Sequence, residues 1–459
     1  MKNSSNISRR EFLSMSGALA GTVLIDPVSS LYAAEKISAD HLLKKTRVAL
    51  VGTGHRGTGM WGKSVMEEYA GYVQFVGLCD KNPGRLEVGR QLIGTDCPVY
   101  TDFEKMMLET KPEVLIVTTD DNTHDYFISR GMELGADIIS EKPMATDERK
   151  IQTIIDAEKR TGKTCRVTFN YRYSPHRAKM WEILRSGEIG ELTSVDFHWY
   201  LDTSHGADYF RRWHRLVEKG GSLWVHKASH HFDLLNWWIE SDPESVYALG
   251  DLEFYGKNGP FRGENCRNCA HTAECKFFFD INKNERLRRL YPENEKYDGY
   301  FRDGCVFRND VNIYDKMAAT IKYKNGVQVS YSLTAYSPYE GYRIAFNGTE
   351  GRMDAWIQES NPTSDANYDE IVVYKNFGKR KYIQIPQGAG HGGGDKLLKD
   401  QIFIPETADP LKQAAGIRDG ALACLIGIAA RKSIASGKPV SIDGLTTIQP
   451  ENQKIYKRV

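Results

Sequence analysis

The sequence has almost no excess charge of either sign, because 61 basic side chains face 60 acidic ones and the formal net charge is +1. Such a chain has no long-range field that would gather nucleic acid or an anionic membrane surface, so neither is expected as a partner. The balanced charge is more consistent with a small neutral ligand than with either of these partners. The chain is also long, and its 459 residues favour two domains over one compact core.

The N-terminal region lacks an apolar run long enough to cross a bilayer. The stretch from Met15 to Ile25 is well short of the ~20 residues that a membrane-spanning helix needs. Arg9 and Arg10 precede it, and the combination resembles a twin-arginine export signal. An arginine pair at the start of an ordinary surface helix is the weaker alternative. We therefore take residues 1–34 as a signal segment and expect a periplasmic or otherwise exported protein, with the twin-arginine translocase as a partner during export.

The stretch RVALVGTGHRGTGMWG begins with the first predicted strand and continues into a glycine-rich turn. Its spacing is Gly52-x-Gly54-x-x-Gly57, with His55 and Arg56 inside the turn. A strand before it and a helix after it make this pattern typical of a dinucleotide site, where backbone approaches the pyrophosphate and the helix N-terminus attracts the phosphates. A second strand ends at Asp80, which can accept hydrogen bonds from ribose hydroxyls. This favours NAD over NADP, although Lys81 and Arg85 weaken the preference.

Strands and helices alternate between residues 45 and 168, which predicts the doubly wound parallel sheet of a Rossmann domain. Ligands bind at the carboxyl ends of the strands in such sheets. The residues expected there, and hence at the cofactor, are Thr118, Asn122, His124, Glu141 and Lys142. His124 could equally be a helix-cap or surface histidine, whereas a lysine that ends a buried strand has little structural reason to be there.

The stretch GGSLWVHKASHHFD, residues 220–233, combines three histidines, a lysine and an aspartate behind two glycines. If it is one helix, His226, His230 and Asp233 share a face, since they are four and then three positions apart. The strongest zinc-binding form of this histidine spacing has a glutamate beside the first histidine, and Lys227 stands there instead. A catalytic role and a partly buried core histidine both remain open, and a metal site is the weakest interpretation.

Four of the eight cysteines lie near one another in the sequence, at Cys266, Cys269, Cys275 and Cys305. The C-x2-C start predicts a closed structural zinc site that holds an insertion of about residues 260–310. Two disulfides are the alternative in an exported protein, and an iron–sulfur cluster is a third one. The pattern gives no indication of a catalytic metal.

The motif EKP at residues 141–143, taken with the glycine-rich turn and with VTFNYRYSP, GEIGEL and FNGTEGRMD, resembles the glucose-fructose oxidoreductase and inositol dehydrogenase family (Gfo/Idh/MocA). The resemblance covers nearly the whole chain after the signal segment. It implies a Rossmann domain at 45–168 and an α/β domain at 169–459 with a large open, mostly antiparallel sheet. It also implies a homo-oligomer and NAD(P)-dependent oxidation or reduction of sugars and cyclitols.

The resemblance assigns roles to three residues, which we predict to be catalytic. Lys142 matches the lysine that contacts the substrate hydroxyl and the nicotinamide, and His230 matches the histidine that accepts or donates the proton. His226 stands where many members have an aspartate, so it would replace that contact to a sugar hydroxyl or share the proton transfer. The chemistry agrees, because histidine titrates in the useful range and a lysine can stabilise a developing alkoxide.

A carbohydrate pocket needs side chains that bind hydroxyl groups. The stretch DTSHGADYFRRWHR, residues 202–215, is rich in them, although it could also be a polar surface loop. The residues predicted to contact the substrate are Arg172, Tyr173, Asp202, His205, Arg212, His226 and Asp233.

Export and NAD chemistry together constrain the reaction. Free NAD is not expected to be abundant outside the cytoplasm, so the cofactor should be tightly bound and recycled in place. A sugar oxidoreductase that passes hydride between two substrates meets this requirement. A redox-neutral glycoside hydrolase or lyase with a transient 3-keto intermediate is the alternative. A carbohydrate-binding protein without chemistry is a third interpretation, which the presence of Lys142, His230 and Asp80 disfavours.

Overall fold

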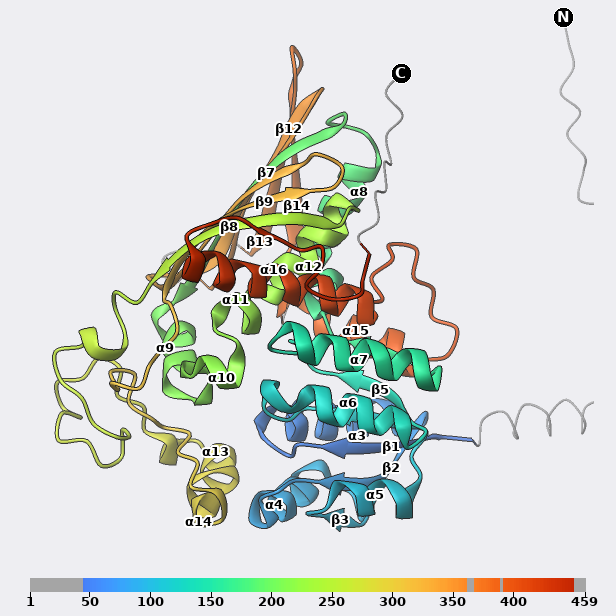
Figure 1. Ribbon diagram of the computed structural model, residues 1–459, viewed down its shortest axis with the longest axis vertical. Coiled ribbons are helices and arrows are strands. Elements are labelled where there is room, and N and C mark those ends of the chain that lie inside the picture. The colour runs from blue at the N-terminus through green and yellow to red at the C-terminus, as the bar shows by residue number, and fades with distance from the viewer. Residues whose placement is uncertain (1–43, 361–366, 389–390, 450–459) are drawn as a thin grey trace, which may run out of the picture. The chain divides into compact units, whose positions relative to one another are not determined.

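The computed structural model describes residues 44–360, 367–388 and 391–449 (Figure 1). The predicted export signal at 1–34 lies outside these residues. Within them, no helix combines the length and the apolar character that crossing a membrane would require.

The first domain is built on a six-stranded parallel sheet with the order β3-β2-β1-β4-β5-β6. Its strands are β1 (Thr46–Val51), β2 (Val73–Cys79), β3 (Val99–Tyr100), β4 (Val114–Val117), β5 (Asp137–Ser140) and β6 (Cys165–Val167). The helical segments between them are a π-helical turn (Gly57–Lys63), α3 (Ser64–Tyr69), α4 (Pro83–Ile93), α5 (Phe103–Thr110), α6 (His124–Glu133) and α7 (Glu148–Thr161). The predicted doubly wound Rossmann sheet is confirmed.

The first strand turns sharply into the first helix because two glycines leave room for backbone. Gly52 has φ +96°, and a Cβ there would lie 2.6 Å from the carbonyl oxygen of Thr118. A Cβ on Gly57 would lie 2.1 Å from the carbonyl oxygen of Gly52. The helix therefore starts directly above β1 and beside the end of β4, where only glycine allows such an approach.

The second domain is built on a nine-stranded sheet with the order β14-β13-β12-β11-β7-β10-β9-β8-β15. Its strands are β7 (Leu192–Asp202), β8 (Pro243–Asp251), β9 (Lys316–Tyr323), β10 (Gln328–Ser337), β11 (Glu340–Gly348), β12 (Gly351–Ser360), β13 (Tyr368–Lys375), β14 (Arg380–Pro386) and β15 (Val440–Ser441). Among the strand pairs of the described residues in this sheet, only the pairing of β7 with β10 is parallel. The expected large, mostly antiparallel sheet is confirmed.

Helices cover one face of this large sheet and leave the other face open (Figure 1). The helices of the second domain are α8 (Pro175–Arg185), α9 (Thr203–Arg211), α10 (Val217–Gly220), α11 (Leu223–His226), α12 (Ala228–Ile239), α13 (Glu285–Leu290), α14 (Glu295–Asp298), α15 (Gly394–Phe403) and α16 (Ile417–Ser436). Side chains alternate between buried and exposed along β9 and β10, as expected for a sheet with one covered face.

The long helix α16 brings the two halves of the chain together. It contacts α11, α12 and β8 of the second domain and also α7 and β6 of the first. Gly427 allows the closest approach, because a Cβ there would lie 2.1 Å from the carbonyl oxygen of Trp224 in α11. The short helix that ends at His226 is therefore held tightly against the middle of α16.

Candidate active site

Glu141 fixes the end of β5 to the start of the first helix. One of its carboxylate oxygens accepts hydrogen bonds from Arg56 Nε at 2.6 Å and from Trp61 Nε1 at 2.7 Å. Burial alone would raise the pKa of Glu141, but Arg56 and the Trp61 hydrogen bond outweigh it and hold that pKa below its ordinary value. Glu141 thus joins the predicted EKP motif to the glycine-rich turn as an ionised carboxylate.

Lys142 is directed from the end of β5 toward the second domain. Its Nζ donates a hydrogen bond to the backbone carbonyl of His226 at 3.1 Å. Burial lowers the pKa of Lys142 to about 8, with Asp121 and Glu141 opposing the decrease. Both protonation states of this amine are therefore accessible near neutral pH, which suits a group that stabilises charge or moves a proton.

His226 forms a dyad with Asp121, which follows β4. The distance from His226 Nδ1 to Asp121 Oδ2 is 2.5 Å, and both side chains are almost fully buried. Burial raises the pKa of Asp121 and lowers that of His226, so the imidazole is neutral. In the tautomer whose Nδ1–H donates to Asp121, Nε2 is the nitrogen that can accept a proton, which is the arrangement of a carboxylate-oriented general base.

His214 completes a buried group of three with this dyad. Its ring meets that of His226 edge to face, with centroids 4.0 Å apart. Among the described residues, Asp121, His214 and His226 are the one set whose ligand-type atoms lie within 4.8 Å of one another. Burial lowers the pKa of both histidines, and the nearby charges of Arg212 and Lys142 lower it further. Two cations disfavour a divalent metal here, so we interpret the group as a proton-handling site.

His230 is held beside this site by stacking. Its ring lies on that of Tyr171 with centroids 4.2 Å apart and an interplanar angle of 16°. Its Nδ1 is buried without a hydrogen-bond partner among the described residues, and burial lowers its pKa. Lys227 donates to the hydroxyl of Tyr171 at 2.8 Å and so fixes the stacking partner. His230 is thus a neutral imidazole in a rigid position.

Residues 226–233 do not form the one helix on which the predicted shared face depends, because α11 ends at His226 and α12 begins at Ala228. His230 and Asp233 both lie in α12, three positions apart, and keep a common face. The turn before α11 is strained. Ser222 adopts φ 69° and ψ 175°, a conformation almost restricted to glycine that costs about 1–3 kcal/mol. His226, His230 and Asp233 contact Asp121, Tyr171 and Arg172 respectively.

Asp233 and Arg172 bind each other in the interior. Arg172 Nε and one terminal nitrogen donate to the two oxygens of Asp233 at 2.8 and 2.6 Å, and that same nitrogen donates to Asp419 at 2.9 Å. Tyr173 is likewise buried and donates to Gln401. These three residues, predicted as substrate contacts, use their polar atoms within the protein and position the segment beneath the site.

The stretch 202–215 is mostly helical. Asp202 caps α9 by accepting from the backbone N–H groups of Ser204 and His205 at 2.8 and 2.7 Å. The His205 ring lies between Glu340 at 3.0 Å and the hydroxyl of Tyr209 at 2.8 Å. Arg212 pairs with Asp208 at 2.9 Å. The Tyr209 ring lies 5.2 Å from that of His226, so α9 forms one wall beside the dyad.

The predicted cofactor residues gather at the carboxyl ends of β1, β2 and β4. Asp80 accepts from the backbone of Thr53 at 2.8 Å and of Asn82 at 2.9 Å. Thr118 Oγ1 donates to the carbonyl of Gly52 at 2.6 Å. Asn122 Oδ1 is buried without a partner among the described residues, as expected of an atom that contacts a ligand. This set fits a dinucleotide.

His124 has a structural position. Its Nδ1 lies 2.8 Å from the carbonyl of Pro143, its Nε2 lies 3.2 Å from that of Thr119, and its side chain is buried. It therefore ties the loop after β4 to the EKP loop. Burial lowers its pKa although both carbonyls favour the protonated ring.

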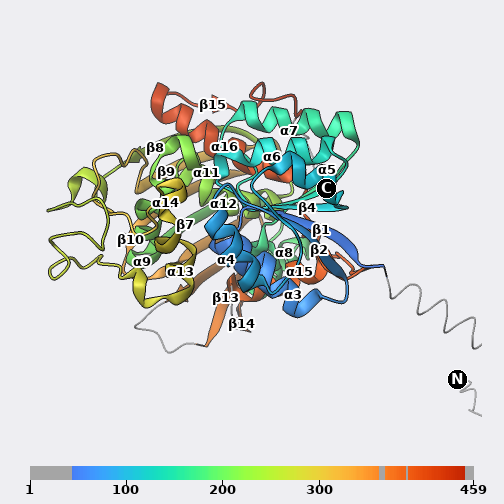
Figure 2. The same cartoon turned by 90° about the horizontal axis from the view of Figure 1, so that it is seen from below.

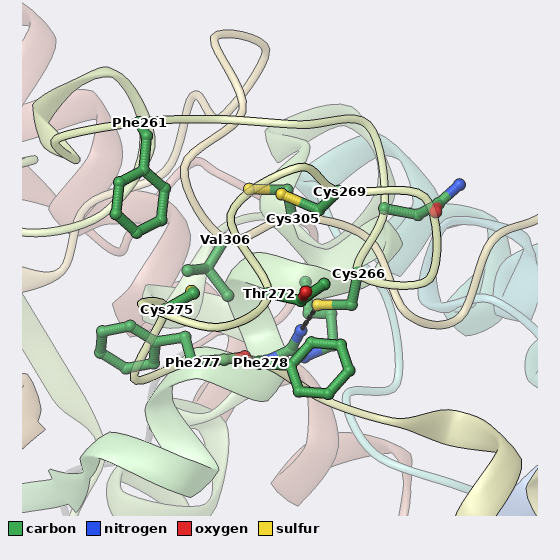
Figure 3. A pocket seen from close by; sticks show the side chains of 11 residues that line it. Phe261, Cys266, Cys269, Thr272, Cys275, Phe277, Phe278, Cys305 and Val306 are labelled. Atoms are coloured by element: carbon green, nitrogen blue, oxygen red, sulfur yellow. Dashed lines mark hydrogen bonds between the residues drawn. The ribbon is translucent and has the colours of Figure 1, made fainter.

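The four clustered cysteines line one pocket together with apolar side chains (Figure 3). All four are free thiols, and Arg211 donates to Cys266 Sγ at 3.0 Å. The insertion therefore brings the four side chains to one pocket. Among the described residues, no three of these sulfur atoms lie within 4.8 Å of one another. The choice between zinc, disulfides and an iron–sulfur cluster stays a prediction.

Sequence reasoning missed Asp121, His214 and Tyr171 as parts of the site. In the sequence, Asp121 is simply the second of two adjacent acidic residues after β4, and His214 is one polar residue of the stretch 202–215. Their importance depends on contacts between distant segments, since Asp121 and His226 are 105 positions apart.

Known families match both halves of this arrangement. Residues 46–169 match the description "Oxidoreductase family, NAD-binding Rossmann fold", and residues 182–442 match "Oxidoreductase family, C-terminal alpha/beta domain". The chain therefore belongs to the Gfo/Idh/MocA family of oxidoreductases, and the predicted resemblance is confirmed.

Individual relatives span most of the chain. The chain is 34% identical over 426 residues to the Bacillus subtilis (strain 168) protein named "Putative oxidoreductase YteT", covering 88% of this chain and 99% of that protein. It is 31% identical over 422 residues to "Glycosyl hydrolase family 109 protein 1" of Akkermansia muciniphila, covering 86% and 80%. A levoglucosan dehydrogenase structure with NADH and levoglucosan has a TM-score of 0.62 at 18% identity, over 87% of this chain and 100% of that one, and shows the shared fold.

Replacement of Asp121 should change the acidity of Lys142. The Asp121 carboxylate raises the pKa of Lys142, so Asp121→Asn is expected to move that pKa below about 8. The measurement is the pH dependence of amine labelling at Lys142, followed by mass spectrometry. Asp120→Asn is the matched control. An unchanged profile in Asp121→Asn, or an equal change in Asp120→Asn, contradicts the dyad's electrostatic link to Lys142.

Removal of Arg172 should destabilise the fold rather than weaken substrate binding alone. Arg172→Ala leaves the Asp233 carboxylate buried without its partner, which costs about 3–5 kcal/mol in the free energy of unfolding. Arg172→Ala with Asp233→Asn should recover part of this loss. Denaturant unfolding measures both variants. If Arg172→Ala is as stable as the wild type, the structural role of Arg172 is contradicted and the predicted contact with the substrate is favoured.

Proposed function

We propose that the protein transfers hydride between a carbinol carbon of a sugar, glycoside or cyclitol and a resident NAD. The main support is the placement of Lys142 on the His226 carbonyl, with His226 held by Asp121, at the carboxyl end of the parallel sheet. A partly buried lysine with a pKa of about 8 and a neutral, carboxylate-oriented histidine are the groups that deprotonation of a hydroxyl requires.

Residues of the first domain would hold the dinucleotide. By analogy with this class of domain, Asp80 would accept from the adenosine ribose hydroxyls, the backbone from Gly52 to Gly57 would bind the pyrophosphate, and Asn122 would contact the nicotinamide side. The bound nicotinamide supplies the hydride acceptor. His226 takes the hydroxyl proton at Nε2 while its Nδ1–H donates to the Asp121 carboxylate, and Lys142 stabilises the negative charge that develops on the oxygen. His230 is a second neutral imidazole near Lys142.

The alternative is a redox-neutral hydrolase or lyase that forms a transient 3-keto sugar. This alternative is supported by the similarity, over 86% of this chain, to a protein named as a glycosyl hydrolase. The same lysine and histidine would serve the oxidation step, so the two classes differ only in what happens to the oxidised sugar.

Export and the resident cofactor can be tested in one preparation. The protein released from cells by osmotic shock should carry about one NAD per chain after denaturation and analysis of the supernatant. Export is proposed from Arg9 and Arg10, and the bound cofactor from the scarcity of free NAD outside the cytoplasm. Recovery only in the cytoplasmic fraction contradicts export. Recovery in the shock fluid without a dinucleotide contradicts the resident cofactor.

The same preparation bears on two further proposals. We propose a structural zinc at the four cysteines, and metal analysis should then give about one zinc per chain. We also propose a homo-oligomer, because the open sheet face carries exposed Tyr247, Leu249, Trp356, Tyr374 and Tyr382. Light scattering should give a multiple of the chain mass. A metal-free protein and a monomeric mass would contradict these proposals respectively.

Turnover with sugars, cyclitols and nitrophenyl glycosides separates the reaction classes. An oxidoreductase is expected to accumulate reduced bound cofactor until a second sugar accepts the hydride, whereas a hydrolase releases nitrophenol without net reduction. Lys142→Met should slow either reaction roughly 10²–10⁴-fold, and the exposed Lys105→Met should not. Ligand binding without either reaction, and unchanged in Lys142→Met, would indicate a binding protein.

A further inference from the structure

The second half of the cysteine-containing insertion lies against the Rossmann domain. α13 packs beside α4, and Figures 1 and 2 show the two helices side by side. A small apolar cluster forms the contact, and its members are Ile281, Leu287, Leu290 and Tyr291 with Val88 and Leu92 of α4. We refer to residues Glu285–Asp298 as the clamp.

The clamp contacts the glycine-rich turn directly. The hydroxyl of Tyr291 accepts a hydrogen bond from the backbone N–H of His55 at 2.9 Å. Arg286 donates to the carbonyl of the same residue at 2.7 Å. A Cβ added to Gly59 would lie 2.2 Å from the Arg286 guanidinium, and one added to Gly54 would lie 3.3 Å from the Tyr291 hydroxyl. The clamp therefore covers the turn that faces the pyrophosphate in this class of domain.

The clamp also fixes the segment that follows β2, where the adenosine ribose binds. Asn82 Nδ2 donates to the carbonyl of Asn294 at 2.9 Å, and Arg85 pairs with Asp298 at 2.7 Å. Arg85 reaches Asp80 at 3.6 Å as well. The clamp therefore contacts both the glycine-rich turn and the segment after β2, the two parts of the domain between which the pyrophosphate would lie.

Arg286 brings positive charge that no carboxylate compensates. It forms no ion pair with an acidic side chain of the described residues, and burial lowers its pKa. Nearby, Arg302 and Arg212 both pair with the single carboxylate of Asp208. Burial, followed by Arg286, Arg302 and Arg212, lowers the pKa of His55 to about 4. The turn therefore has an excess of positive charge, which a pyrophosphate would neutralise.

We propose that Arg286 and Tyr291 of the clamp are part of the cofactor site, that Arg286 binds the pyrophosphate of the dinucleotide, and that the clamp must lift for the cofactor to leave. This deepens the proposed function, because it supplies the physical means by which NAD stays resident. The clamp is anchored to the cysteine-lined pocket through Arg267, which contacts Glu295 of α14 and Asp303, whose carbonyl accepts from the backbone of Cys266.

Replacement of Arg286 should release the cofactor. In Arg286→Ala the dissociation rate of NAD, measured by exchange with isotopically labelled NAD on the full chain, is expected to rise about tenfold or more, as loss of a charge-assisted hydrogen bond implies. Arg286→Lys should be intermediate, because it keeps the charge and loses the planar fork. Arg288→Ala is the matched control from the same helix, since Arg288 pairs with Glu293 and should exchange like the wild type.

The outcomes separate this inference from the proposed function. Equal exchange rates in Arg286→Ala and Arg288→Ala overturn the clamp, even if both proteins carry NAD. If the wild type carries none, the resident cofactor fails, and titration with NAD then tests the clamp alone. A tenfold weaker affinity in Arg286→Ala than in Arg288→Ala supports it, and equal affinities overturn it. Thermal melting of each variant establishes that the fold is intact.

Discussion

The position of Lys142 depends on the hydrogen bonds that Glu141 accepts from Arg56 and Trp61. A buried carboxylate is tolerated only when its charge is compensated, and these two donors compensate it. Both come from the helical start that follows the glycine-rich turn. The end of β5 is therefore fixed relative to that turn, and the lysine one residue further on is placed between the cofactor position and the second domain.

The second domain completes the site through backbone as much as through side chains. The Lys142 amine contacts the carbonyl of His226, so its position depends on where α11 ends. That end is set by the strained Ser222 and by the close approach of α16 at Gly427. Burial then leaves neutral histidines and a weakly basic lysine, which is an interior suited to uncharged hydroxyl groups.

Local patterns were enough to predict the Rossmann half. Its strands alternate with helices, and Gly52, Gly57 and Asp80 mark the places where backbone must turn or a polar group must end a strand. The family motifs extended the prediction to the second sheet. The helix break at Lys227, which separates His226 from His230 and Asp233, could not be predicted, because it depends on tertiary packing rather than on spacing.

Pairings between distant segments could not be predicted either. The sequence shows Arg172 and Asp233 as two polar residues near a pocket, and nothing local indicates that each satisfies the other in the core. The same applies to Asp121 and His226. A charged residue in a sequence has a preferred environment, but the identity of its partner depends on the folded chain.

The clamp has a consequence for the order in which the protein is made. The glycine-rich turn ends at Gly57, whereas Arg286 and Tyr291 come much later from the ribosome. A Rossmann domain that folds during synthesis presents an open dinucleotide site until the insertion emerges and docks. On the proposal above, the dinucleotide would be captured during this interval, while the chain is still in contact with the cytoplasmic pool. Tight retention afterwards would follow from the timing of synthesis as well as from affinity.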